Sequence, residues 1–233
     1  MAAPFRPEPK FFLLDDLYAR GLPYYEATFF GHKPGARLRG EKTVSYMESD
    51  KAAERIAAAF PQARIVFLLR DPLERAISHY WFSVENGVET LSMEQAFRRE
   101  EDGNMGEEWS RLSMSPFTYL RRGCYVHSVE RYEALFGRGG VRILLYEDLV
   151  GDPGCFSGLC EWLGVSGDVA PKAPPRDVNL RADKGEPISA GLRKRLAEHF
   201  ADPTAQLAAR YGLDLTVWTD QWSAATDTHT PRG

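Results

Sequence analysis

Two short apolar runs stand out in the pattern of hydrophobic and polar positions. Residues 65–69 read Ile-Val-Phe-Leu-Leu, and residues 141–146 read Val-Arg-Ile-Leu-Leu-Tyr. Runs of this length are typical of strands buried on both faces, as in a parallel sheet covered by helices. We therefore predict two central strands here, and a further strand over residues 38–43.

Helix signals fill the intervals between these strands. Ser49 or Asp50 can cap a helix that stops at a proline, Asp71 can cap a helix that Pro72 begins, and Ser92 starts a capping box. Apolar positions then recur with helical spacing. The predicted helices lie at 13–30 (two short ones separated at Gly21), 50–60, 72–84, 92–101, 116–136 (interrupted at Gly123), 153–163, 189–200 and 203–211.

The alternation of strands and helices predicts an α/β fold with a parallel sheet and right-handed crossovers. The length of 233 residues, 43% of them hydrophobic, suits one domain over residues 1–233. Polar loops are expected at 103–115 and 166–188, and about 219–233 is expected to be a flexible tail.

Composition narrows the class of protein. The net charge of -4 argues against a general nucleic-acid binder, and no apolar run approaches the roughly 20 residues of a membrane span. The first residues contain no apolar signal core, so a cytoplasmic protein is the default expectation. The spacing of Cys124, Cys155 and Cys160 fits no zinc pattern, and the five histidines are scattered, so no metal is predicted.

Arg70 and Ser78 are the first candidates for chemistry. Ligands of open α/β sheets bind beyond the C-terminal ends of the strands. Arg70 stands where a predicted strand meets a helix, and a helix start with an arginine suits a phosphate. Ser78, about two turns later, could donate to the same phosphate. Taken singly, each residue is more often an ordinary surface charge or helix serine.

Residues 69–80, which read LRDPLERAISHY, resemble the 3′-phosphate-binding motif of sulfotransferases that use 3′-phosphoadenosine 5′-phosphosulfate (PAPS). The resemblance is to the branch that includes heparan sulfate sulfotransferases and many bacterial enzymes. It implies that Arg70 and Ser78 hold the 3′-phosphate of PAPS. It also implies a P-loop-like, three-layer α/β/α fold with a central parallel sheet.

The segment Gly40-Glu41-Lys42-Thr43-Val44-Ser45-Tyr46 resembles the family's G-E-K-S/T-P-x-Y segment, with valine at the usual proline. The resemblance implies that Lys42 lies by the acceptor and the transferring sulfuryl group, and that Tyr46 contacts the acceptor substrate. A lysine at a strand end can stabilise charge on sulfuryl oxygens. The plainer alternative is a solvated charge at the end of a strand.

Residues 8–12, Glu-Pro-Lys-Phe-Phe, resemble the family's K-E-x-x-F-F segment, although Pro7 stands where a lysine is common. The resemblance implies that Glu8 is the general base and that Lys10 contacts the substrate. An acceptor hydroxyl is a poor nucleophile, and a carboxylate can take its proton during attack. The alternative for Glu8 is a flexible terminal charge.

Two later segments also follow the family's order. Gly123-Cys124-Tyr125 matches its G-x-Y helix, which we interpret as scaffold. Asp183-Lys184-Gly185 resembles the late loop in which a Lys-Gly pair, here Lys184 and Gly185, closes over PAPS. The glycosaminoglycan enzymes have a disulfide beside this loop. No cysteine follows Cys160 here, which weakens a Golgi-type assignment.

One part of the family pattern is absent from the sequence. The family begins with a strand and a P-K-x-G-S/T-S/T loop, which cradles the 5′-phosphosulfate and precedes the Glu8-like segment. Only seven residues precede Glu8, and His32-Lys33-Pro34-Gly35 neither follows a buried strand nor opens a helix. We expect that the first strand and phosphate loop are missing, through a truncated or misplaced start or through a defective product.

Three functions follow from these observations. The leading hypothesis is an enzyme that moves the sulfuryl group of PAPS, without a metal, to a hydroxyl or amine of a glycan or small molecule. The second is a non-catalytic relic that binds adenosine 3′,5′-bisphosphate. A P-loop nucleotide kinase is disfavoured because no G-x-x-x-x-G-K-S/T motif occurs. The sequence predicts no nucleic-acid or membrane partner and leaves the oligomeric state open.

Overall fold

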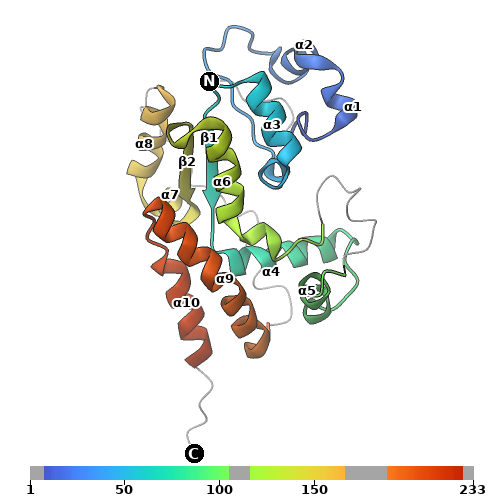
Figure 1. The fold of residues 1–233 in the computed structure, drawn as a ribbon, viewed down its shortest axis with the longest axis vertical. Helices are drawn as coiled ribbons and strands as arrows, with labels where there is room; N and C mark the ends of the chain where they lie inside the picture. The colour runs from blue at the N-terminus through green and yellow to red at the C-terminus, as the bar shows by residue number, and fades with distance from the viewer. Residues whose placement is uncertain (1–7, 105–115, 166–187, 228–233) are drawn as a thin grey trace, which may run out of the picture. The chain divides into compact units, whose positions relative to one another are not determined.

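The structure is a computed structural model that describes residues 8–104, 116–165 and 188–227 (Figure 1). The sequence predicts one domain, whereas the internal contacts divide the chain into two compact units. The described part of the N-terminal unit comprises residues 8–65 and 128–141. The described part of the second, the sheet unit, comprises 66–104, 116–127, 142–165 and 188–227.

Short helices and an aromatic cluster build the start of the N-terminal unit. Gly21 adopts a φ of 77°, which few other residues tolerate, and separates two helices as predicted. Phe11, Phe12 and Tyr25 are buried together, and the rings of Phe11 and Tyr25 lie 4.7 Å apart. The elements are α1 (Asp15–Tyr18), α2 (Gly21–Tyr25) and the π-helix Glu26–Phe30.

The strand predicted over residues 38–43 is wrong. Only Arg39 makes a single bridge, and a 3-10 helix, Val44–Glu48, follows. The segment is held by its side chains rather than by a ladder, since the hydroxyl of Thr43 accepts from the Lys10 N–H at 3.3 Å. Helix α3 (Asp50–Ala59) begins as predicted, and Ser49 is its cap, because its Oγ accepts from the Ala52 N–H at 3.1 Å.

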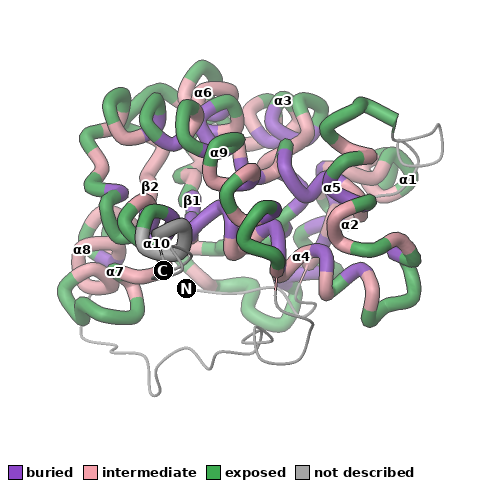
Figure 2. Tube along the Cα trace, turned by 90° about the horizontal axis from the view of Figure 1, so that it is seen from below, coloured by how far each residue is buried: buried purple, intermediate pink, exposed green. Residues whose placement is uncertain are grey.

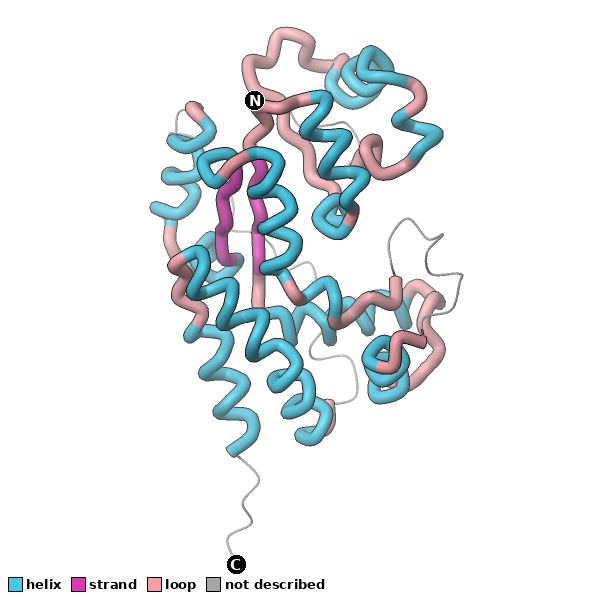
Figure 3. Tube along the Cα trace, viewed as in Figure 1, coloured by secondary structure: helices cyan, strands magenta, loops and turns pink. Residues whose placement is uncertain are grey.

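The predicted central strands form a two-stranded sheet among the described residues. Strands β1 (Ile65–Leu69) and β2 (Val141–Leu145) lie side by side (Figure 3). The expectation that β1 is buried on both faces is wrong. Phe67 and Leu69 are buried, but Val66 is 38% exposed and Leu68 is 51% exposed. One face of β1 therefore presents apolar side chains to solvent.

Helices of the sheet unit follow the sequence signals closely. Helix α4 (Pro72–Glu85) buries Leu73, Ala76, Ile77 and Tyr80 along one stripe. Helix α5 (Met93–Glu101) has the predicted capping box, and α8 (Pro153–Leu163) ends at Gly164 with a φ of 71°. The 3-10 turn Arg121–Gly123 and helix α7 (Tyr146–Gly151) also belong to this unit. Helix α6 (Tyr125–Phe136) begins in it, whereas its residues 128–136 and the 3-10 turn Arg138–Gly140 belong to the N-terminal unit.

The helix predicted from residue 116 begins later, at Tyr125, because Gly123 lies in a turn packed against other side chains. A Cβ at Gly123 would lie 2.5 Å from a ring carbon of Phe200 and 3.2 Å from Cβ of Pro72. Only glycine allows such close approach without displacement. The G-x-Y segment is thus scaffold, as predicted, at a contact between helices.

The C-terminal region differs from the prediction. The two helices predicted at 189–200 and 203–211 are one helix, α9 (Ala190–Tyr211), with Pro203 inside it. A proline in a helix costs about 3 kcal/mol, but each buried side chain such as Phe200 or Leu207 contributes roughly 1.5–3 kcal/mol, so packing prevails. Helix α10 (Thr216–Asp227) replaces much of the expected tail, with Trp218 and Trp222 buried. Figure 2 colours the buried positions purple.

Candidate functional site

The side chains of Glu8 and Lys42 form an ion pair in the N-terminal unit. Lys42 Nζ lies 2.6 Å from Glu8 Oε1; the lysine side chain is 69% exposed and the glutamate side chain 26%. Exposed pairs contribute only about 0.2–1 kcal/mol, so this contact can open for a ligand. A carboxylate and an ammonium so placed can act on one reaction, the first as proton acceptor and the second on negative oxygens.

Backbone contacts hold the two segments that carry this pair. The Lys10 N–H donates to Thr43 Oγ1 at 3.3 Å, and the Phe12 N–H donates to the hydroxyl of Tyr46 at 3.2 Å. Tyr46 is only 8% exposed. The buried hydroxyl of Tyr46 thus supports residues 8–12 from within the protein. A contact between Tyr46 and the substrate stays a prediction.

Glu41 is a site group that sequence reasoning overlooked. Its Oε2 is buried and has no hydrogen-bond partner among the described residues. Burial raises the pKa of this carboxyl to about 7, although hydrogen bonds from Tyr25 and Tyr46 favour its charged form. The only sequence signal is its position beside Lys42. A carboxyl that titrates near neutrality thus supports the tyrosine that positions residues 8–12.

Arg70 and Ser78 lie on the sheet unit, at the C-terminal end of β1 and on α4. Arg70 Nη2 donates to the carbonyl of Glu74 at 2.9 Å, and the Tyr125 hydroxyl donates to the carbonyl of Arg70 at 3.0 Å. Ser78 is half-buried and lies one helical turn after Glu74. Both residues predicted to bind phosphate therefore border Glu74.

Asp71 occupies the helix start that the sequence suggests for phosphate. Its Oδ1 accepts from the N–H groups of Leu73 at 2.8 Å and Glu74 at 3.3 Å. Its carboxylate also accepts from Trp222 Nε1, and burial raises the pKa of Asp71 to about 6. Asp71 is thus the cap of α4, as the sequence predicts, and its carboxylate occupies these two amides. An anion bound here depends on the side chains of Arg70 and Ser78.

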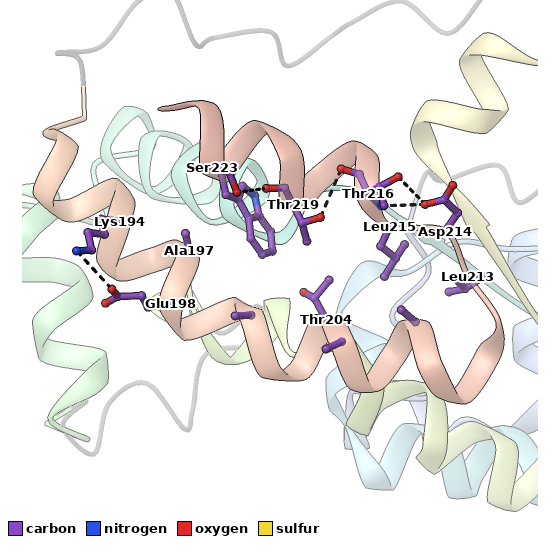
Figure 4. Close-up of a pocket in the computed structure, with 14 residues that line it drawn as sticks. Lys194, Ala197, Glu198, Thr204, Leu213, Asp214, Leu215, Thr216, Thr219 and Ser223 are labelled. Atoms are coloured by element: carbon purple, nitrogen blue, oxygen red, sulfur yellow. Dashed lines mark hydrogen bonds and ion pairs between the residues drawn. The ribbon is translucent and has the colours of Figure 1, made fainter. Parts of the chain in front are cut away.

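A groove of about 560 Å³ lies elsewhere on the sheet unit, between α9 and α10 (Figure 4). Alanines of α9 and Trp222 of α10 supply much of its apolar lining, with hydroxyls of Thr204, Thr219 and Ser223. None of Glu8, Lys42, Arg70 or Ser78 lines it. Its size alone therefore does not mark the candidate site.

Comparison with known proteins decides the family. A model described as the sulfotransferase family matches residues 6–168, which include the segments around Glu8, Lys42, Arg70 and Ser78. The chain belongs to the sulfotransferase family. This sulfotransferase also resembles the crystal structure of a sulfotransferase from Alicyclobacillus acidocaldarius, with 29% identity and a TM-score of 0.74. That similarity covers 93% of this chain and 87% of the bacterial one.

Curated relatives match a shorter part of this sulfotransferase. The mouse heparan sulfate glucosamine 3-O-sulfotransferases 3B1 and 3A1 are each 30% identical over 147 residues. The match covers 63% of this chain and 35% of each relative, so the chain spans about a third of these proteins. The membrane-associated sulfotransferase kil1 of Dictyostelium discoideum is 34% identical over 70 residues, 29% of this chain and 15% of that protein.

Three further predicted site residues are Lys184, Gly185 and Lys10. Lys184 and Gly185 lie outside the described residues. Lys10 follows Glu8 by two residues and has a positive φ of 54°. Within the described ranges, no group of three or more metal-ligating side chains occurs, and no helix is long and apolar enough to cross a membrane.

Proposed function

We propose that this sulfotransferase transfers the sulfuryl group of PAPS to a hydroxyl or amine of a glycan or small molecule. The observation that carries the proposal is the 2.6 Å contact between Lys42 Nζ and Glu8 Oε1. It brings together the two side chains that the family resemblance assigns to proton transfer and charge stabilisation. The relatives' printed names, which include glycan sulfotransferases, support a glycan acceptor.

Glu8 is the general base in this proposal. One of its oxygens contacts Lys42, and a carboxylate accepts hydrogen bonds through both oxygens. Glu8 takes the proton of the acceptor hydroxyl while the acceptor oxygen forms a bond to sulfur. The bond between sulfur and the leaving phosphate oxygen breaks, and its electron pair stays with adenosine 3′,5′-bisphosphate. Lys42 stabilises the sulfuryl oxygens as charge shifts across them.

Arg70 and Ser78 anchor the 3′-phosphate of the nucleotide in this proposal. The guanidinium offers a fork of donors that fits phosphate oxygens, and the hydroxyl offers one more. Their common neighbour Glu74 supports the assignment, because Arg70 donates to its carbonyl and Ser78 follows it by one turn on α4. Lys184 and Gly185, which precede α9 in the sequence, are proposed to cover the bound nucleotide.

Donors for the 5′-phosphosulfate are proposed to come from a strand and loop that the described residues do not include. The open face of β1 supports this, since Val66 and Leu68 are 38% and 51% exposed and parallel strands are ordinarily covered on both faces. The sequence contains no P-K-x-G-S/T-S/T segment. Transfer by this chain is therefore expected to be slow.

Transfer of labelled sulfate from PAPS to a panel of glycan and small-molecule acceptors tests the proposal. We expect slow transfer that Glu8→Gln lowers by about 10²–10⁴-fold, with nucleotide affinity nearly unchanged. Glu54→Gln, an exposed change on α3, is the matched control and should keep wild-type transfer. Nucleotide binding with no transfer to any acceptor would favour the non-catalytic relic. Full activity of the Glu8→Gln variant would mean that another residue is the general base.

A further inference from the structure

Arg193 of α9 contacts the part of α4 that carries the predicted phosphate ligands. Its Nη1 lies 2.7 Å from Oε1 of Glu74, and the side chains are 24% and 37% exposed. The carbonyl of the same Glu74 accepts from Arg70 Nη2 at 2.9 Å. Two guanidinium groups, from segments far apart in the sequence, thus meet at one residue.

Ser78 lies on the same side of α4 as this contact. Residues four apart on a helix have Cβ atoms roughly 5–6 Å apart, so the side chains of Glu74 and Ser78 are neighbours. A phosphate held by Arg70 and Ser78 would therefore lie close to the Glu74 carboxylate. Two like charges about 4 Å apart repel by about 4 kcal/mol near a protein surface. A cation at Glu74 is needed to offset this repulsion.

An arginine can serve the carboxylate and a phosphate together. Guanidinium has five N–H donors, and Arg193 contacts Glu74 Oε1 through Nη1. We propose that Arg193 is a third ligand of the nucleotide's 3′-phosphate, beside Arg70 and Ser78. It selects nucleotides that bear a 3′-phosphate over those that bear only a 5′-phosphate. This inference rests on the proposed function and extends it to a residue outside the 69–80 motif.

Calorimetric binding of two nucleotides tests the role of Arg193. The probes are adenosine 3′,5′-bisphosphate and adenosine 5′-monophosphate, which lacks the 3′-phosphate. Arg193→Ala should weaken binding of the bisphosphate by about tenfold to a hundredfold, as loss of a charged hydrogen bond does, and should change the monophosphate affinity less than about twofold. Glu74→Gln removes the same ion pair but keeps the arginine, and should bind the bisphosphate several times more tightly.

The double variant separates direct contact from simple neutralisation of Glu74. If Arg193 touches the phosphate, Arg193→Ala combined with Glu74→Gln should bind the bisphosphate about tenfold more weakly than Glu74→Gln alone. Equal affinities of these two variants would overturn the inference. The inference would also be overturned if Arg193→Ala and Glu74→Gln, as single changes, weakened binding of the bisphosphate equally. That outcome would mean that the ion pair has only a structural role.

Arg195→Ala is the matched control. Arg195 lies on the same helix, contacts Glu94 at 2.6 Å and Glu101 at 3.0 Å, and has a side chain 32% exposed. Its removal should leave both affinities unchanged, and a loss equal to that of Arg193→Ala would overturn the inference. A wild-type protein that binds the two nucleotides equally would instead contradict the proposed function itself.

Discussion

The indole N–H of Trp222 lies 3.0 Å from Oδ2 of Asp71, and both side chains are 5% exposed. This contact joins α10 to the turn between β1 and α4, next to Arg70. A buried carboxylate that also caps a helix needs such donors, because an unpaired buried charge is costly. The C-terminal helix thus completes the surroundings of a candidate phosphate ligand.

Trp222→Phe should destabilise the protein by removing this donor while keeping an aromatic ring. Leaving one buried acceptor without its partner costs about 1–3 kcal/mol. We expect urea denaturation to show that decrease in the free energy of unfolding. Val217→Ala, at a position 41% exposed on the same helix, should change stability by less than about 0.5 kcal/mol. Equal stability of Trp222→Phe and wild type would show that Asp71 needs no indole donor.

Local signals predicted the elements that border the candidate site. Asp71 caps α4 and Ser92 caps α5 because each signal lies within a few residues of the helix it begins. The α10 helix was missed because residues 216–227 are mostly polar or small. Only the burial of Trp218 and Trp222 against distant residues reveals it. Pro203 favours a break between two helices, but α9 continues through it because tertiary packing outweighs the local cost of the proline.

The sequence predicts which segments form the candidate site, but it does not predict which of their side chains are in contact. The segments around Glu8 and Lys42 were identified separately, and the 2.6 Å pair between them required the fold. Glu41 and Arg193 gave no usable signal, because burial and partners 119 positions away are set by tertiary structure. The exposure of one face of β1 could not be predicted either, because its residues are apolar on both faces.

Arg70→Ala should weaken binding of adenosine 3′,5′-bisphosphate by about 2–4 kcal/mol, as loss of one partner in a desolvated charge pair does. Ser78→Ala should cost roughly 1 kcal/mol, the value of one hydrogen bond. Calorimetry on both variants checks these values. Arg98→Ala, with a side chain 62% exposed on α5, is the control and should bind like wild type. Unchanged affinity in both variants would remove the phosphate role from Arg70 and Ser78.

Glu41 should make the protein less stable as pH rises. Burial raises its pKa from an ordinary 4.5 to about 7, so between these values the folded state holds a proton that the unfolded state has released. The free energy of unfolding therefore falls from about pH 4.5 to pH 7, by up to about 3 kcal/mol, and then levels off. Asp71, with a pKa raised to about 6, adds a decrease in the same direction at lower pH.

Glu41→Gln isolates this contribution, because glutamine cannot ionise but can still accept from the tyrosine hydroxyls. Urea denaturation at pH 4.5, 6 and 8 should show that the variant loses less stability with rising pH than wild type. The part due to Asp71 should remain in both proteins. Identical pH dependence would mean that Glu41 is solvated well enough to ionise normally.

The 5′-phosphosulfate is the part of the nucleotide at which the bond breaks during transfer. Its leaving phosphate gains charge as the sulfur–oxygen bond breaks, and fixed donors are needed to stabilise that charge. Lys42 is the one predicted site residue assigned to this end of the nucleotide, and removal of a single such donor commonly costs about 10²–10³ in rate. An apolar strand followed by a P-K-x-G-S/T-S/T loop, added before residue 1, should therefore raise turnover by at least that factor. The exposed Val66 and Leu68 of β1 offer the added strand an apolar face.

Sulfate release from labelled PAPS should be compared in three proteins: residues 1–233 alone, the extended protein, and an extended protein whose loop lysine and glycine are alanine. The third protein separates donation by the loop from simple covering of β1. It should be more stable in urea than residues 1–233 alone, but its turnover should be no higher. In the active extended protein, Glu8→Gln should again lower turnover by about 10²–10⁴-fold, because the base acts on the acceptor and not on the leaving phosphate. Full turnover by residues 1–233 alone, unchanged by the extension, would show that these residues already supply every donor the reaction needs.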